Sequence, residues 1–208
     1  LGDVYKRQIL GYSVAAAIVF TYVGFSSEYA VAGYGSATRI EQVVLLPILG
    51  INTAIISIIA QNIGAKQHNR VEKSYFTSVR YGLCLMIIAG IIIYLTAEIV
   101  PKFFSSNTDV IAYGTMYLKI SAFILPAYPI FFLSNGFFMA LKKSEKAMLN
   151  NIIRNVIVPI LSFYIARHIN ADFKTFFYIW AAFQWTISLL LFAYVNYYIK
   201  NKLSLIHI

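Results

Sequence analysis

The sequence predicts an all-α integral membrane protein with six transmembrane helices. Of its 208 residues, 60% are hydrophobic and only 12% are charged, and a mean hydropathy of +0.70 is atypical of a soluble domain. Apolar stretches of about 20 residues, each long enough to cross a hydrocarbon core of roughly 30 Å, recur along the chain. They are too long and too uniformly apolar for barrel strands, so helices must satisfy the backbone inside the lipid.

Short polar connectors separate the six expected helices. Their expected bounds are Ile9–Phe25, Ala37–Gln61, Ser74–Val100, Val110–Leu141, Ala147–Ile169 and Phe173–Ile199. The fourth contains Pro126 and Pro129, which remove backbone hydrogen bonds and predict a bend. Broken helices of this kind line cavities in transporters, although a kinked packing helix would show the same pattern.

The two ends of the chain have a separate origin in our interpretation. Residues 3–8 read DVYKRQ and residues 203–208 read LSLIHI, and reverse-complementary nucleotide strings can encode the two hexapeptides. We interpret both as read-through of a sequencing adapter, which has to be kept out of fold reasoning. Residues 1–8 and 203–208 are therefore expected to be adapter-derived, and residues 9–202 to form one six-helix transmembrane unit.

Alternate connectors carry most of the positive charge. The cations on one side are Lys66, Arg70, Lys73, Lys142, Lys143, Lys146, Lys200 and Lys202, with Arg80 and Arg154 in flanking turns. The positive-inside rule makes this side cytoplasmic, which predicts a multi-pass protein of the inner (plasma) membrane with both ends in the cytoplasm. The net charge of +9 is thereby explained without a nucleic-acid partner. Gly64 is expected to be the left-handed residue that ends the second helix.

The sequence lacks the patterns of catalytic, metal and cofactor sites. The strings GYG and NIGAK have neither the spacing of a nucleotide-binding glycine loop nor its Lys-Ser/Thr pair. Cys84 is the only cysteine, and His68 and His168 lie in connectors on opposite sides. These features predict a protein that is not an enzyme and that holds no metal and no cofactor.

Charged side chains inside the expected helices mark the candidate site. Glu41 is expected about 10 Å below the outer surface, at about 1.5 Å per residue, and Lys119 lies at a comparable depth. Charges at such depth are costly and usually mark a pathway or a buried pair. We expect Glu41 to couple protonation or ion binding to substrate movement, with Arg39 or Lys119 tuning its pKa. A structural salt bridge or a snorkelling side chain is the alternative.

Three uncharged polar residues complete the candidate set. Gln42 lies beside Glu41 in the second expected helix. Asn52 and Asn135 are weaker candidates for substrate or ion coupling, because amides inside membranes more often form hydrogen bonds between helices.

The stretch ATRIEQVVLLPILGINTAIISIIAQNIGAKQHNRVEKS resembles the multidrug and toxic compound extrusion (MATE) family, in the second helix of its C-terminal lobe and the following loop. The residues that carry the resemblance are Arg39, Ile40, Glu41, Pro47, Gly50, Gln61, Asn62, Gly64, Ala65 and Arg70. Gly136, the string ALKKSEKAMLNNIIRN and Pro159 are similar to a later part of the same lobe. The resemblance covers nearly all of residues 9–202.

The resemblance implies a twelve-helix fold of two six-helix lobes, of which this chain would be the C-terminal one. It implies a secondary active antiporter that exports organic cations or drugs against a proton or sodium gradient, rocking between inward-open and outward-open states. The implied partners are membrane lipid, the N-terminal lobe of the same polypeptide and small amphiphilic or cationic substrates. Two alternatives are a lipid-linked saccharide flippase, with more cationic residues facing its cavity, and a non-transporting membrane scaffold.

Overall fold

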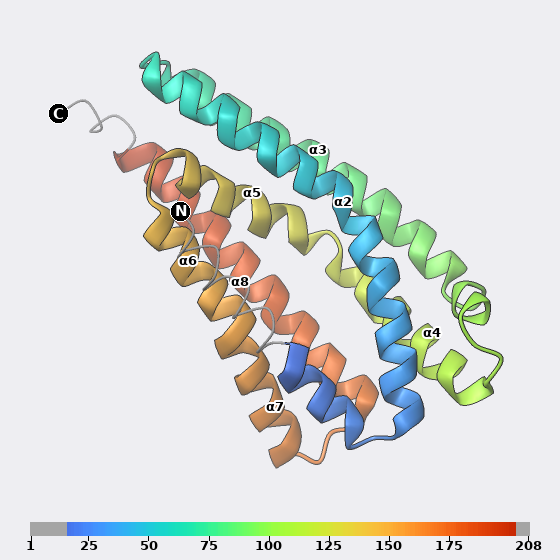
Figure 1. The fold of residues 1–208 in the computed structure, drawn as a ribbon. Helices are drawn as coiled ribbons and strands as arrows, with labels where there is room; N and C mark the ends of the chain where they lie inside the picture. Colours follow the sequence, from blue (N-terminus) through green and yellow to red (C-terminus); the bar gives the residue numbers. More distant parts are fainter. Residues whose placement is uncertain (1–15, 203–208) are drawn as a thin grey trace.

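The computed structural model describes residues 16–202, and within that range the chain is helical with no strand (Figure 1). The expected adapter-derived ends, residues 1–8 and 203–208, lie outside the described residues. The elements in order are a first helix over residues 16–24, α2 (Glu28–Gly64), α3 (His68–Thr96), the 3₁₀ turn η1 (Val100–Phe103), α4 (Thr108–Ile124), α5 (Ala127–Ala140), α6 (Ser144–Ile152), the π-helical turn η2 (Ile153–Ile157), α7 (Val158–His168) and α8 (Phe173–Lys202).

The all-α membrane architecture is confirmed. Among residues 16–202, four helices are long and apolar enough to cross a membrane: α2, α3, the continuous run Ser144–His168, and α8. The pair α4 and α5 passes the same test together, as one span bent by 51°. The first expected span, Ile9–Phe25, is described only from residue 16.

The fourth span is broken where its prolines predict. The helix α4 ends at Ile124, and α5 begins directly after Pro126, which has no N–H to continue the backbone ladder. The helix α3 packs tightly beside this break, because a Cβ at Gly90 would lie 2.7 Å from the carbonyl oxygen of Ala122. The bend is therefore fixed by both the proline and a close helix contact.

The helix α2 begins nine residues earlier than expected, at Glu28 instead of Ala37. The Ser27 side chain caps it by accepting a hydrogen bond of 3.0 Å from the amide of Ala30. Gly33 lies inside α2, and its missing side chain allows close packing on α4, where a Cβ would lie 2.6 Å from the carbonyl oxygen of Val110. Glu41 thus follows the first helical residue by 13 positions, which places it about 20 Å along the helix.

The expected role of Gly64 is wrong. Gly64 is the last helical residue of α2, and the left-handed residue is Lys66, with φ of 59°. The amide of Lys66 donates to the carbonyl of Ile63, and that of Gln67 to the carbonyl of Asn62, the paired bonds of a Schellman motif. This motif places its left-handed residue two positions beyond the helix, where a cation also complements the helix dipole.

The basic connectors gather at one end of the molecule. Figure 1 shows the α2–α3 turn, the α5–α6 turn and the end of α8 at the upper left, and the remaining connectors toward the lower right. Two of the cations fasten α6 to α8, because Lys143 donates to the hydroxyl of Tyr198 and Lys146 to that of Tyr194. Their ammonium groups also lie 4.7 and 4.9 Å from the centres of these rings.

Candidate functional site

A cavity of about 450 Å³ lies among the first helix, α2, α4, α5, η2 and α8. This volume is within the range of small-molecule sites, roughly 300–1,000 Å³. The polar residues of its lining are Thr38, Glu41, Gln42, Arg154, Asn155 and Gln184, and the aromatic ones are Tyr34, Tyr117, Tyr128, Phe132 and Trp180. Polar groups that converge between aromatic walls are typical of a binding site for an amphiphilic molecule.

Glu41 is held in this cavity by two phenols. Its side chain is 6% exposed, and it accepts one hydrogen bond on each carboxylate oxygen, from the hydroxyl of Tyr117 and from that of Tyr128. Tyr117 belongs to α4 and Tyr128 to α5, so the two donors lie on either side of the 51° bend. Glu41 of α2 is thereby connected to both halves of the broken span.

Aromatic neighbours fix the orientation of Tyr117. The ring of Tyr34 meets it edge-on, with centroids 4.9 Å apart, and the ring of Phe177 contacts it at the same centroid distance. Tyr34 and Phe177 also stack on each other at 5.3 Å. Such packing leaves the phenol few alternative positions, so its hydroxyl is directed at the carboxylate.

Arg154 is the second charged group of the cavity, and it was missed as a site residue. Its position in the sequence indicates a cytoplasmic flanking cation, but Arg154 is 6% exposed and lines the cavity. Its Nε donates to Oε1 of Gln184 at 2.7 Å, and its Cζ lies 4.3 Å from the ring centre of Phe131 and 4.7 Å from that of Tyr128. Arg154 lies ten positions beyond Ser144, the first residue of α6, so counting it with the connector overlooks its depth in the span.

Asn155 follows Arg154 on the same π-helical turn and also lines the cavity. It is 8% exposed, and within residues 16–202 its Nδ2 has no hydrogen-bond partner. The carbonyl of Asn155 has no backbone donor four residues further on, because Pro159 has no N–H. Pro159, visible in the sequence, was the signal that this turn departs from a regular helix.

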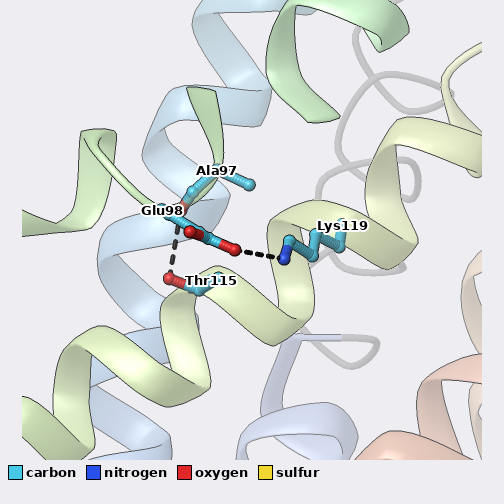
Figure 2. Close-up of polar contacts among 4 residues, drawn as sticks. All are labelled: Ala97, Glu98, Thr115 and Lys119. Atoms are coloured by element: carbon cyan, nitrogen blue, oxygen red, sulfur yellow. Dashed lines mark hydrogen bonds and ion pairs between the residues drawn. The ribbon is translucent and has the colours of Figure 1, made fainter. Parts of the chain in front are cut away.

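The sequence allowed an ion pair between Lys119 and Glu41, but the structure does not contain it. Figure 2 shows the lysine directed at Glu98, with Nζ and Oε1 2.6 Å apart, beside the bond of 3.0 Å from the Thr115 hydroxyl to the carbonyl of Ala97. The hydrogen bond from Lys119, followed by its charge, lowers the pKa of the Glu98 carboxyl, which lies beyond the end of α3. Arg39 is exposed and forms no ion pair within the described range.

The two candidate asparagines lie outside the cavity lining, whereas Gln42 lies in it beside Glu41. Asn135 joins α5 to α6, accepting from Asn150 at 3.1 Å and donating to Asn151 at 3.4 Å. Asn52 packs against Gly136, where an added Cβ would lie 2.3 Å from its Oδ1. A part in ion coupling stays a prediction for both.

The residues of the family-like loop close α2 and open α3. Gln61, Asn62 and Gly64 belong to the last turn of α2, and Ala65 is its C-terminal cap. Arg70 lies in the first turn of α3 and donates to the side chain of Gln67 at 3.0 Å. Gln61 follows Glu41 by 20 positions on one helix, or about 30 Å, so this loop is remote from the cavity.

Comparison with known proteins identifies relatives among transporters. The family model of MatE matches residues 7–165. The chain is 27% identical over 150 residues to the probable multidrug resistance protein YpnP of Bacillus subtilis, covering 72% of this chain and 32% of that protein. It is 23% identical over 193 residues to the multidrug export protein MepA of Staphylococcus haemolyticus, covering 92% and 41%. The chain thus spans less than half the length of these relatives.

Solved structures share the fold of the chain. An outward-facing multidrug resistance MATE family transporter of the MOP superfamily matches with a TM-score of 0.90 and 20% identity, over 96% of this chain and 45% of that one. A MOP superfamily transporter from Pyrococcus furiosus matches with a TM-score of 0.88 and 19% identity, over 93% and 44%. The expected lobe of a two-lobe transporter is thereby confirmed as the fold, and the chain belongs to the MatE family, a family of transporters and not of enzymes.

Proposed function

We propose that the chain is the C-terminal lobe of a secondary active antiporter that exports amphiphilic molecules, among them organic cations and drugs, in exchange for protons or sodium ions. The observation that carries this proposal is Glu41, a carboxylate buried in a cavity of small-molecule size and bonded to both halves of a broken span. The names of two relatives, a probable multidrug resistance protein and a multidrug export protein, support the same function.

The hydrogen bonds from the two phenols depend on whether a proton or a sodium ion is bound to the Glu41 carboxylate. An ionised carboxylate accepts from both Tyr117 and Tyr128, whereas a protonated one carries its own hydrogen and must donate it. A sodium ion at the carboxylate likewise competes with the phenol hydrogens. Either event alters the connection of α2 to α4 and α5 across the 51° bend, so ion occupancy biases the helix arrangement.

A second lobe is required by this proposal. Antiporters of this type move one repeat against another around a site between them, and the described chain offers one face of such a site. The partner is the N-terminal lobe of the same polypeptide, in a membrane whose lipid contacts the outer helix faces. A lobe alone is not expected to export substrate.

The charge of the cavity favours the antiporter over the two alternatives. A lipid-linked saccharide flippase is expected to have an excess of cations, but the described lining contains one carboxylate, Glu41, and one guanidinium, Arg154. A scaffold without transport gives no reason for a buried carboxylate in an open cavity, since burying it is costly. One relative carries the name FAD transporter, which extends the substrate range to consider beyond cations.

The proposed orientation places both ends of the lobe in the cytoplasm of a cell whose inner (plasma) membrane it spans. Single cysteines at Asn69, in the first turn of α3, and at Ser106, in the connector before α4, test it in the full-length protein with Cys84 replaced by Ser; both positions are exposed. An impermeant maleimide added outside should label the cysteine at Ser106 and spare the one at Asn69. Labelling of both would contradict the orientation.

Dye efflux from cells tests the transport function itself. The full-length gene, expressed in a host that lacks its own multidrug exporters, should lower the accumulation of ethidium, and dissipating the proton and sodium gradients should restore it. Residues 9–202 expressed alone should leave accumulation unchanged at equal membrane abundance. Export by this half alone would overturn the two-lobe proposal.

A further inference from the structure

We propose that Arg154 and Asn155 form a binding site for an anionic group of the substrate, so that zwitterionic amphiphiles bind more tightly than simple organic cations. This inference rests on the proposed transport function and names its substrate class. It narrows the expected range of amphiphilic or cationic substrates to molecules that also carry an anionic group.

The π-helical turn η2 brings the two side chains into one cavity. Arg154 and Asn155 are consecutive residues, and both line the cavity around Glu41. Single π-turns inside α-helices are uncommon and frequently occur at functional sites. Here the turn places a charged residue and a neutral one in the lining of the same cavity.

Both residues carry hydrogen-bond donors that have no acceptor among the described residues. Within residues 16–202, Nε is the only guanidinium nitrogen of Arg154 that donates a hydrogen bond, and it donates to Gln184. Asn155 is more than nine-tenths buried, yet its Nδ2 has no partner in the described chain. A buried donor without an acceptor is costly, so an acceptor supplied by the ligand satisfies it.

The carboxylate of Glu41 is already engaged. Both of its oxygens accept from phenols, and Tyr128 contacts both charges, through its hydroxyl to Glu41 and through its ring to Arg154 at 4.7 Å. Because Nε is the only guanidinium nitrogen that donates within residues 16–202, the other nitrogens remain available, and planar donors of this kind match a carboxylate in a bidentate manner.

The rest of the cavity fits the remainder of such a molecule. Tyr34, Phe132 and Trp180 offer aromatic surface for a flat body, and Glu41 offers the negative charge that attracts a cationic group. A molecule with both kinds of group can bind Arg154 through its anionic group and Glu41 through its cationic group. A simple cation leaves Arg154 without its complement.

Rhodamine B and its ethyl ester are suitable probes, because they differ only in whether the carboxylate is free. The fluorescence anisotropy of each dye is measured as a function of the concentration of the purified full-length protein in detergent micelles. The helicity of each variant is checked by circular dichroism. Rhodamine B should bind about tenfold more tightly than the ester, the value of one hydrogen bond between charged groups. Arg154→Gln and, separately, Asn155→Ala should reduce this preference to less than about threefold.

Lys119→Gln is the matched control, because it removes one positive charge that lies outside the cavity. It should retain the full preference. Equal binding of both dyes, tighter binding of the ester, binding of neither, or a preference that survives Asn155→Ala would overturn the inference. Asn155→Ala decides the matter if Arg154→Gln loses its helicity, since Asn155 carries no charge.

These experiments can contradict the proposed transport function and the proposed substrate class independently of each other. Loss of dye efflux from cells by the full-length protein, with the rhodamine B preference intact in the purified chain, would contradict only the proposed transport function. Efflux without any such preference would contradict only the inference about Arg154 and Asn155.

Discussion

Two carboxylates of this lobe have opposite surroundings. Glu41 is buried in the cavity and is held by the neutral donors Tyr117 and Tyr128. Glu98 lies near the surface, with its side chain 70% exposed, and is held by a cation, Lys119, at 2.6 Å (Figure 2). A full ion pair occurs where water already screens the charges, and the buried carboxylate has only phenols in direct contact.

The difference shows which carboxylate can respond to an ion. An exposed ion pair contributes little to stability, because water and salt screen its charges. A buried carboxylate without a directly bound cation has no fixed counter-charge at its oxygens, so a proton or a sodium ion can supply one. The variants below are therefore expected to separate the two sites by the size of their effects.

Glu41→Gln should have the largest effect. The amide cannot take up a proton or bind sodium as a carboxylate does, so efflux by the full-length protein should fall by roughly tenfold or more, the scale of typical coupling free energies. Surface abundance, measured by quantitative immunoblot, serves as the control. Normal efflux at normal abundance would remove Glu41 from the coupling mechanism.

Tyr128→Phe should have an intermediate effect. It removes one of the two hydrogen bonds to Glu41 but leaves the bond from Tyr117 and the ring beside Arg154. Loss of one such bond should lower efflux about two- to tenfold. Tyr117→Phe should behave alike, and the double variant should approach Glu41→Gln. A double variant as active as the unchanged protein would show that the phenols do not support Glu41.

Glu98→Gln should have the smallest effect, with no measurable change in efflux or thermal midpoint. Lys119 lowers the pKa of Glu98, so whatever the pair contributes is present above the ordinary carboxyl pKa and is lost as the pH falls through the lowered value. Solvent screening keeps that contribution small. A marked loss of stability at neutral pH would mean that the comparison between the two carboxylates is wrong.

The sequence predicted the helices well because lipid leaves the backbone no alternative to helix. It predicted the bend in the fourth span for a similar reason, since Pro126 cannot continue a ladder. It misplaced the start of α2, because the glycine that looks like a connector, Gly33, is a close contact with α4 that only the tertiary structure reveals.

The site was predicted in part. Glu41 was visible as the carboxylate deepest inside a span, but its partners Tyr117 and Tyr128 lie 76 and 87 positions further along the chain. No local pattern distinguishes these two among sixteen tyrosines, most of which suit an interfacial belt equally well. Arg154 was misread because its position near a connector hides a side chain that a π-helical turn directs inward.

Ion movement coupled to substrate movement tests the central role of Glu41 most directly. The full-length protein, reconstituted in vesicles that contain either a pH-sensitive or a sodium-sensitive dye, is given a substrate gradient, and ion flux is recorded. We expect the unchanged protein to move protons or sodium ions against the substrate, and we expect Glu41→Gln to abolish this flux while Glu98→Gln preserves it. Undiminished ion flux in Glu41→Gln would show that Glu41 does not couple ion movement to substrate movement.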